Sequence, residues 1–393
     1  MRLVLSSIAL AALASAAPRH VTDAEVARVQ RSVILIDTHN DVTSDTVDGL
    51  DIGKRRDTGH TDLVRLKEGG VGATFFAAFV EASYVKSNQS AHRTLEMIDT
   101  IRQDIADRYP QGVVLALTAA DIERAHRQHK LAALIGIEGG HAIEDSLRLL
   151  RDYYALGVRY MTLTHVNTNN WADSSGDIDD PAVTHHNGLT PFGRDVVREM
   201  NRLGMMVDIS HVADKTFFDA LETSTAPLIA SHSSCRAISN VPRNMTDEMI
   251  VALAKKGGVV DVNFACEFLS QKSADASAPI MKQMMTAPDQ AARNALMAEY
   301  KKLMVRASLD DVIAHVDHIV KIAGIGAVGI GSDFDGVGCT PAGLDDVSKY
   351  PALTRALLEH GYSAADIREI YGGNVLRVMR AVEAESRRLR AAK

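Results

Sequence analysis

Cysteine is scarce in this sequence, which has only Cys235, Cys266 and Cys339 among 393 residues. A small and odd number of cysteines excludes a network of disulfides as the basis of the fold. At most one bridge can form within the chain. The sequence does not indicate whether any two of the three cysteines pair, or which two they would be.

The chain also has no excess of positive charge. Its 43 lysines and arginines are outnumbered by 50 aspartates and glutamates, the formal net charge is −7, and no basic stripe occurs. Proteins that bind nucleic acid usually carry such a stripe on one face. Nucleic acid is therefore not expected as a partner.

The N-terminal apolar run is too short to span a membrane. Residues 3–13 follow Arg2 and precede the small residues Ala14-Ser15-Ala16, a pattern typical of a secretory signal peptide. We predict that residues 1–16 are a signal peptide and that the mature protein is exported, either to the periplasm or into the medium. The charged C-terminus argues against a membrane anchor there.

The remaining residues, 17–393, are expected to form a single domain. The chain is 46% hydrophobic and 24% charged, which suits a globular protein with one large core. No low-complexity linker divides it. An α/β fold of the (β/α)8 TIM-barrel type, with inserted loops and extra helices, fits this length.

Eight apolar strand-like runs alternate with amphipathic helical patterns along the chain. Most of the runs are continuously apolar, which is typical of parallel strands covered on both faces. Before the last run, Ser308 is the predicted N-cap of a helix, Asp311 completes a capping box, and Gly324 is the predicted C-cap. The predicted strands are residues 33–37, 71–79, 132–137, 158–164, 205–209, 227–231, 258–263 and 327–331.

Side chains that can bind metals or transfer protons follow most of these runs directly. In a TIM barrel the C-terminal ends of all strands converge on one face, which carries the active site. A barrel would thus gather residues from the first and eighth strands, whereas an open sheet would not do so as readily. These residues are His39, Asp41, Glu138, His165, His211, His232 and Asp333.

Five of these residues form a candidate pair of metal sites. Four can act as terminal ligands, and the Glu138 carboxylate can bridge two ions. Nitrogen and oxygen donors without a thiolate suit zinc, although manganese and cobalt accept similar donors. Two ions about 3.5–4 Å apart can hold a shared hydroxide and polarise a carbonyl. The predicted terminal ligands of two Zn²⁺ per chain are His39, Asp41, His211 and His232.

A series of motifs resembles the renal (membrane) dipeptidase family, which consists of zinc dipeptidases with an amidohydrolase-type barrel. The resemblance runs from about residue 33 to 380. It implies the same five metal ligands and the hydrolysis of dipeptides by a bridging hydroxide, including dipeptides with a C-terminal D-residue. It also makes a homodimer an expectation. The motifs are "DTHND", "IGIEGGH", "MTLTHVNTNNWADS", "GLTPFG", "LGMMVDISHV", "SHSSCRAISNVPRNMTDE", "GIGSDFDGV", "GLDDVSKYP" and "GGNVLRV".

The resemblance also implies three roles outside the metal ligands. His165 would contact the substrate and its tetrahedral oxyanion, and Arg243 would hold the substrate carboxylate. Asp333 would accept a proton and contact the substrate amine, with Asp335 as the alternative for this role. Residues 174–187 and 266–307 show no clear family pattern, so the side-chain preference of the pocket stays open.

Two other functions remain open from the sequence. One is a metal-dependent lactonase or other amidohydrolase on the same barrel, because a fold does not determine a substrate. Arg243 discriminates against it, since a lactonase needs no carboxylate clamp. The other is a non-catalytic, metal-stabilised binding protein, which would be expected to have lost ligands that this chain keeps.

The other histidines are expected to be structural. His141 is predicted to support the metal ligands, and the rest to lie in solvent or in packing contacts. Trp171 either lines the pocket or packs in the core. The histidines predicted to be solvated are His126 and His129, and those predicted to pack are His315 and His318.

Overall fold

The computed structural model describes residues 20–285 and 290–392. The predicted signal peptide, residues 1–16, lies outside the described residues. The first described helix is α1 (Asp23–Ser32). Among the described residues, no helix combines the length and the apolar character that crossing a membrane would require.

Eight parallel strands form a barrel in the order β1-β2-β4-β5-β6-β7-β8-β9. The ring closes between its two ends through an isolated parallel bridge between Asn40 and Phe334. Beside this bridge the Asp41 amide donates to the Phe334 carbonyl at 2.9 Å. The strands are β1 (Leu35–Asn40), β2 (Val71–Phe79), β4 (Leu131–Glu138), β5 (Val158–Thr162), β6 (Met206–Asp208), β7 (Ile229–Ser233), β8 (Val259–Val262) and β9 (Val328–Ile330).

The predicted TIM-barrel fold is therefore confirmed, with one strand that the sequence did not predict. β3 (Val113–Leu115) pairs only with the first three residues of β4. β5 pairs with β4 from residue 135 onward, so β3 occupies the space beside β4 that β5 leaves free. A three-residue strand is too short to show an apolar period in the sequence.

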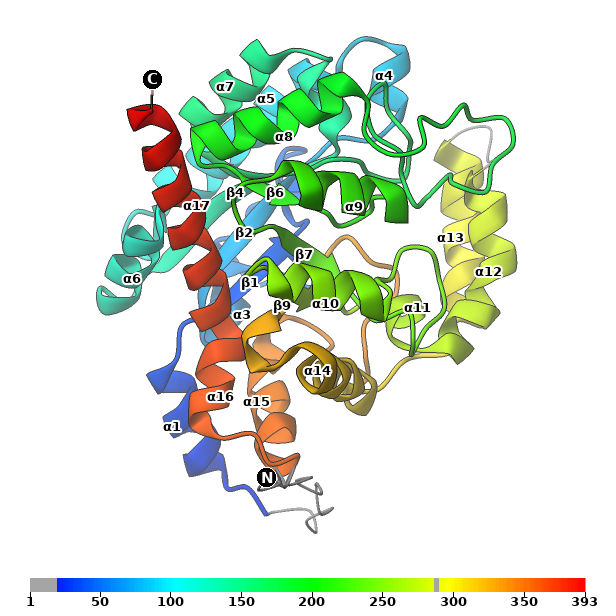
Figure 1. Cartoon of the computed structure of the whole chain (residues 1–393). Helices are drawn as coiled ribbons and strands as arrows, with labels where there is room; N and C mark the ends of the chain where they lie inside the picture. The colour runs from blue at the N-terminus through cyan, green and yellow to red at the C-terminus, as the bar shows by residue number, and fades with distance from the viewer. Residues whose placement is uncertain (1–19, 286–289, 393) are drawn as a thin grey trace, which may run out of the picture.

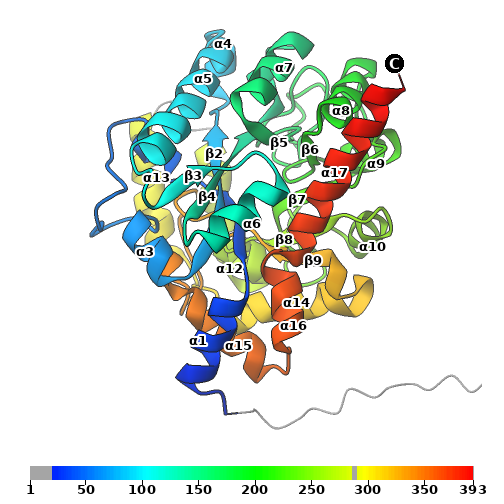
Figure 2. The ribbon, with the colours of Figure 1, turned by 90° about the vertical axis from the view of Figure 1, so that its left-hand side faces the viewer.

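Helices surround the strands, which lie at the centre of the view in Figure 2. This cover explains why the residues of β2 and β4 are buried on both faces. The α-helices after α1 are α2 (Thr43–Thr46), α3 (Leu63–Glu68), α4 (Ser83–Lys86), α5 (Ser90–Thr100), α6 (Ala119–Arg127), α7 (Leu147–Leu156), α8 (Pro191–Leu203), α9 (Asp214–Thr223), α10 (Asp247–Lys255), α11 (Cys266–Leu269), α12 (Gln271–Met285), α13 (Gln290–Leu303), α14 (Leu309–Ala323), α15 (Tyr350–Glu359), α16 (Ala364–Arg368) and α17 (Asn374–Ala391).

Short helical turns complete the chain. They are the π-helical segments η1 (Ile101–Asp107) and η5 (Glu369–Gly373), and the 3-10 turns η2 (Gly140–Ile143), η3 (Ile325–Ala327) and η4 (Val347–Lys349). The helix predicted before the last strand is α14, and both of its predicted ends are confirmed. The Ser308 side chain accepts from the Asp311 amide, the Asp311 side chain accepts from the Ser308 amide, and Gly324 is the C-cap with φ 86°.

An inserted helical segment stands at one side of the barrel. Figure 1 shows α12 and α13 at the right of the view, apart from α6 and α17 on the left. Cys266, at the start of α11, forms a disulfide with Cys339 in the loop after β9. Cys235 is free and buried. The bridge therefore joins the base of the inserted helices to the loop that carries Asp333 and Asp335.

Candidate metal centre

Side chains from six strands meet at the C-terminal end of the barrel, with Glu138 at their centre. The Glu138 Oε1 atom lies 2.9 Å from His211 Nε2 and 3.2 Å from His232 Nε2. Its Oε2 atom faces the other way and lies 3.6 Å from His39 Nε2. The two oxygens of one carboxylate thus have different nearest imidazoles within one cluster, which suits a bridging ligand.

Several buried atoms of this cluster have no hydrogen-bond partner among the residues that the structure describes. Two of them, His39 Nε2 and Asp41 Oδ2, lie 3.2 Å apart. Leaving buried polar atoms unpaired is costly, at about 1–3 kcal/mol each. A metal ion would satisfy both atoms at once, and a donor set of imidazole and carboxylate groups without thiolate fits zinc.

Close donor spacing extends over the whole cluster. Within the described part of the chain, three groups offer ligand atoms that all lie within 4.8 Å of one another. The groups share members, so they form one continuous region that can hold more than one ion. They are His39, Glu138 and His232; Glu138, His165 and His211; and His39, Asp41 and Asp333.

A hydroxyl group determines the tautomer of His39. The Tyr160 hydroxyl lies 2.7 Å from His39 Nδ1 and donates to the Thr38 carbonyl at 3.1 Å. Because the hydroxyl has only one proton, His39 Nδ1 must be the donor in the first contact. In the neutral form of His39 the lone pair therefore lies on Nε2, the atom that faces the carboxylates and is available to a metal.

The surroundings of Glu138, His211 and His232 favour an ionised carboxylate and two neutral imidazoles. Burial would raise the pKa of Glu138, but the imidazoles of His39, His165 and their neighbours hold it well below its usual range. Burial and the nearby Arg243 charge lower the pKa of His211 and also that of His232. Metal binding requires deprotonated ligands, so these directions suit a metal centre.

His39 differs from the other two imidazoles. Burial would lower its pKa, but Tyr160 and the carboxylates Asp41 and Glu138 outweigh burial and raise the pKa well above its usual value. In the metal-free protein the protonated His39 imidazole thus supplies positive charge next to the carboxylates, as a bound metal ion would. The carboxylates therefore favour a cation at this position.

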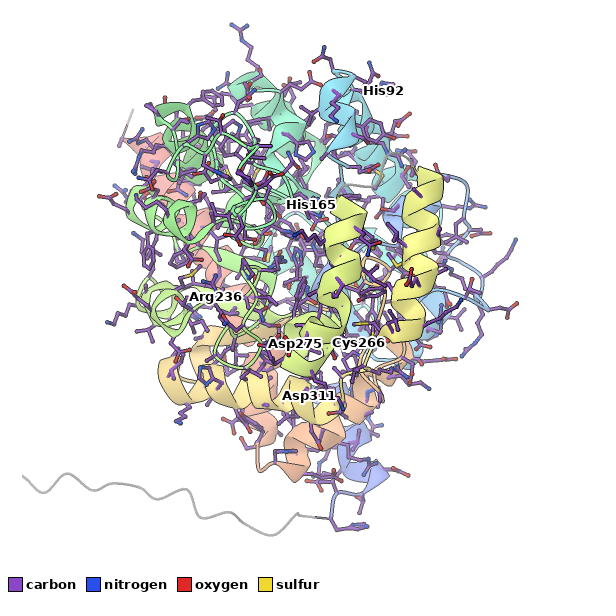
Figure 3. All side chains as sticks on the ribbon, turned by 90° about the vertical axis from the view of Figure 1, so that its right-hand side faces the viewer. His92, His165, Arg236, Cys266, Asp275 and Asp311 are labelled. Carbon is purple, nitrogen blue, oxygen red and sulfur yellow. A yellow bond between two sulfur atoms is a disulfide. The ribbon has the colours of Figure 1, made fainter. Side chains whose placement is uncertain are left out.

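Two further residues predicted from the resemblance lie at the edge of the cluster. The His165 side chain is 17% exposed, and its Nε2 lies 3.8 Å from Glu138 Oε1. Figure 3 shows His165 on the face where α12 and α13 stand, with Cys266 at the foot of these helices. The His165 ring packs edge-on against Phe79, so its position is restrained by packing.

Arg243 reaches the cluster from the loop after β7. Its Nη1 donates to Ser233 Oγ at 2.9 Å and its Nη2 donates to the His232 carbonyl at 2.6 Å. The guanidinium lies over the Phe268 ring, 5.4 Å from the ring centroid. Burial lowers the pKa of Arg243 to about 10, so the group stays positively charged at neutral pH.

The structure separates the two aspartates after β9. Asp333 lies with His39 and Asp41, and its Oδ2 accepts from Asn263 Nδ2 at 2.7 Å. Asp335 Oδ1 instead accepts from the His60 amide at 2.7 Å. Burial and the charge of Asp41 raise the pKa of Asp333 well above its usual value, which favours proton acceptance.

Several candidate residues lie further inside the strands than predicted. His39, Glu138 and His232 belong to β1, β4 and β7, whereas the sequence placed each of them after a strand. The correction has a simple cause: strand hydrogen bonds join backbone groups and continue past the last apolar side chain. His165, His211 and Asp333 do follow their strands.

The structure confirms some predictions for the other histidines and corrects others. His141 is buried and its Nε2 contacts the Val80 carbonyl at 2.9 Å, so it packs next to the cluster. His315 is a buried packing residue and His129 is exposed, as predicted. His126 is half-buried because α6 packs its side chain near β2. His318 was expected to pack, but it forms a polar contact instead. Its Nε2 lies 2.7 Å from Oδ1 of Asp247, the first residue of α10.

Trp171, for which the sequence left two roles open, packs in the core: it is fully buried and lies edge-on against Phe192.

Three other residues near the site were not predicted from the sequence. Tyr160 lies in β5, Asn263 directly follows β8, and Phe268 lies in α11, and all three resemble scaffold residues in the sequence. Only the tertiary fold brings them to the histidines. A polar residue directly after a strand is the signal that could have marked Asn263.

The comparisons with known proteins agree with this geometry. The model of the membrane dipeptidase family (Peptidase family M19) matches residues 23–393. The chain belongs to this family. It is a metallo-dipeptidase, which decides against a lactonase or a non-catalytic binding protein.

Curated relatives of this dipeptidase extend over nearly the same length. Dipeptidase verJ of Clonostachys rogersoniana is 37% identical over 374 residues, which cover 91% of this chain and 86% of the relative. An uncharacterized dipeptidase of Schizosaccharomyces pombe is 36% identical over 366 residues, which cover 89% of this chain and 81% of the relative.

Two solved structures share the fold. The probable dipeptidase PvdM of Pseudomonas aeruginosa has a TM-score of 0.79 and 25% identity, and the match covers 92% of this chain and 98% of that one. A metallo peptidase of Rhodobacter sphaeroides, liganded with a phosphinate mimic of the dipeptide L-Ala-D-Ala, has a TM-score of 0.72 and 27% identity. That match covers 89% of this chain and 99% of the other.

Proposed function

We propose that this dipeptidase works with two zinc ions that share Glu138. His39 and Asp41 hold the first ion, and His211 and His232 hold the second. The single observation that carries the proposal is the placement of the Glu138 carboxylate, whose Oε1 faces one pair of imidazoles and whose Oε2 faces His39. A carboxylate whose two oxygens have different imidazole neighbours can bridge two ions.

Bound zinc ions would lower the pKa of a shared water molecule and polarise the carbonyl of the scissile bond. Asp333 accepts the proton of the attacking water and transfers it to the leaving amine. Its position beside His39 and Asp41 suits this task. His165, half-buried at the edge of the cluster, donates a hydrogen bond to the oxyanion that forms during attack.

Arg243 binds the free carboxylate of the dipeptide. Its guanidinium is charged and held in place by Ser233, by the His232 carbonyl and by the Phe268 ring. A planar guanidinium can form two parallel hydrogen bonds with a carboxylate, which gives geometric selection as well as affinity. The distance between Arg243 and the metal centre therefore determines which peptide length fits, and longer peptides are excluded.

The C-terminal residue of the substrate is proposed to be accepted in the D-configuration. The metal centre, Asp333 and Arg243 constrain the carbonyl, the amine and the carboxylate, and they leave the side chain of that residue less constrained. The Rhodobacter sphaeroides relative, which holds a mimic of L-Ala-D-Ala, supports this extension. We expect L-Ala-D-Ala to be cleaved within about tenfold of the rate for L-Ala-L-Ala, or about 1.4 kcal/mol in barrier.

Two experiments test these proposals. Metal analysis of the purified active protein should find two zinc ions per chain, and Glu138→Gln should lose both activity and one ion, because a neutral amide bridges two cations poorly. A dipeptide panel with chiral analysis of the released alanine should show cleavage of both diastereomers. One ion per fully active chain would contradict the binuclear centre, and intact L-Ala-D-Ala would contradict the stereochemical proposal.

Export of the protein is also proposed. The disulfide between Cys266 and Cys339 supports it, since disulfides persist in oxidising compartments. Residues 1–16 carry the pattern of a signal peptide. N-terminal sequencing of the mature protein from cell fractions would test both the cleavage position and the compartment, and sedimentation of the same sample would test the expected homodimer.

A further inference from the structure

Asp208 is a fully buried carboxylate next to the histidine cluster, at the end of β6. Its Oδ2 accepts from Thr162 Oγ1 and from Ser231 Oγ, each at 2.6 Å. Its Oδ1 accepts from the Ser231 amide at 2.9 Å and from the Ser210 amide at 3.1 Å. All four partners are donors, which is the environment of an ionised carboxylate that only accepts hydrogen bonds.

The Ser231 hydroxyl connects this carboxylate to His232. Ser231 Oγ lies 2.6 Å from Asp208 Oδ2 and 2.7 Å from His232 Nδ1. The hydroxyl has one proton, and the charged carboxylate is its strongest available acceptor. A third neighbour, Ser210 Oγ, is further away at 3.5 Å. Ser231 therefore donates to Asp208, and His232 Nδ1 must donate to Ser231.

We propose that Asp208 is a positioning residue that keeps His232 in its metal-binding tautomer through Ser231. With the proton of His232 on Nδ1, the lone pair lies on Nε2, which faces Glu138 Oε1 at 3.2 Å. The inference rests on the proposed function, in which His232 is a zinc ligand. It adds two residues, Asp208 and Ser231, that touch neither the metal nor the substrate.

A comparison with His39 explains why this hydrogen-bond direction depends on Asp208. The hydroxyl that contacts His39 belongs to Tyr160, whose proton goes to a backbone carbonyl that no substitution can remove. The hydroxyl that contacts His232 gives its proton to a side chain. Changing that side chain reverses the direction of hydrogen bonding only at His232.

Asp208→Asn replaces an oxygen by an amide group of the same size. The amide group can donate to Ser231 Oγ, and Ser231 then has to donate its own proton to His232 Nδ1. The proton of His232 moves to Nε2 and blocks the metal. By contrast, Ser231→Ala removes the contact without imposing the wrong direction, so His232 can still adopt the binding tautomer.

The experiment measures zinc affinity of metal-free protein by competition with a chromogenic chelator, for the wild type, both single variants and the double variant. Substitutions in the hydrogen-bond partners of metal ligands typically cost 10–100-fold in metal affinity. We expect a loss of about 10–100-fold for Asp208→Asn and of less than about tenfold for Ser231→Ala. We expect the double variant to bind zinc about as tightly as Ser231→Ala.

The recovery of affinity in the double variant separates positioning from general damage. If Asp208 only supports the fold, the double variant binds zinc at least as poorly as Asp208→Asn, and the inference is wrong. Asp219→Asn is the control, because Asp219 is also a buried carboxylate, but its partners are the Leu189 amide, Lys215 and Arg194 rather than a residue that contacts a metal-binding histidine. Its zinc affinity should equal that of the wild type.

The two levels of the proposal fail in different ways. If the wild type binds fewer than two zinc ions, the binuclear centre itself is wrong. If the wild type binds two ions and Asp208→Asn binds them equally tightly, the centre stands and the role of Asp208 is wrong. The circular dichroism spectrum of each variant identifies any loss of affinity that comes from unfolding.

Discussion

Asp261 is a buried carboxylate that should destabilise the protein, and its replacement should show this directly. The residue lies in β8 and is fully buried. Neither of its carboxylate oxygens has a hydrogen-bond partner among the described residues. Burial, followed by the charge of Asp208, raises the pKa of Asp261 well above its usual value.

The magnitude follows from proton linkage. In the unfolded chain an aspartate has a pKa of about 3.9. The folded protein keeps a proton at Asp261 that the unfolded chain releases, so stability falls as the pH rises above about 4 toward the folded pKa. Over this range each pH unit lowers the free energy of unfolding by about 1.4 kcal/mol, because one proton separates the two states.

Asp261→Asn removes this proton but keeps the size of the side chain. The assay is urea unfolding of metal-free wild type and variant between pH 4 and 7, because bound ions would add their own stabilisation. The variant should match the wild type near pH 4 and gain stability over it as the pH rises, by about 1.4 kcal/mol per pH unit for as long as the pH stays below the folded pKa of Asp261. A stability difference that does not change with pH would show that Asp261 does not keep its proton on folding.

Three further predictions follow from the described contacts. Arg243→Ala should raise KM for dipeptides at least about tenfold. Arg243→Lys should restore only part of the lost affinity, because a point charge replaces a planar guanidinium. Equal turnover of a dipeptide and its C-terminal amide by the wild type would argue against this role of Arg243. Replacing Cys266 and Cys339 by serine should lower the free energy of unfolding by about 4 kcal/mol in urea, from the loop of 73 residues that the disulfide closes; an unchanged urea midpoint would contradict this. Burial lowers the pKa of His315 to about 4, so the unfolded chain takes up a proton at higher pH than the folded protein does. The free energy of unfolding should therefore fall by up to about 3 kcal/mol from pH 6.5 to 4. His315→Gln should remove this part of the pH dependence of stability, and an identical pH dependence in the variant and the wild type would contradict the prediction.

Features that depend on neighbouring residues could be predicted from the sequence. The apolar runs of β2 and β4 predict buried parallel strands because both faces must avoid water. The capping box of Ser308 and Asp311 and the C-cap at Gly324 depend on contacts within one helix, and all were predicted correctly. The order of polar residues at the strand ends also sufficed to predict the barrel and its metal-binding face.

Contacts between strands that lie far apart in the chain could not be predicted from the sequence, because they arise only in the folded barrel. Which aspartate after β9 joins His39, and which two cysteines pair, depend on loop paths that no local pattern encodes. The same holds for the hydrogen bonds of Tyr160 and Asp208 to distant residues. A barrel brings such side chains within hydrogen-bond distance of each other through its register, and the register results from the packing of the whole core.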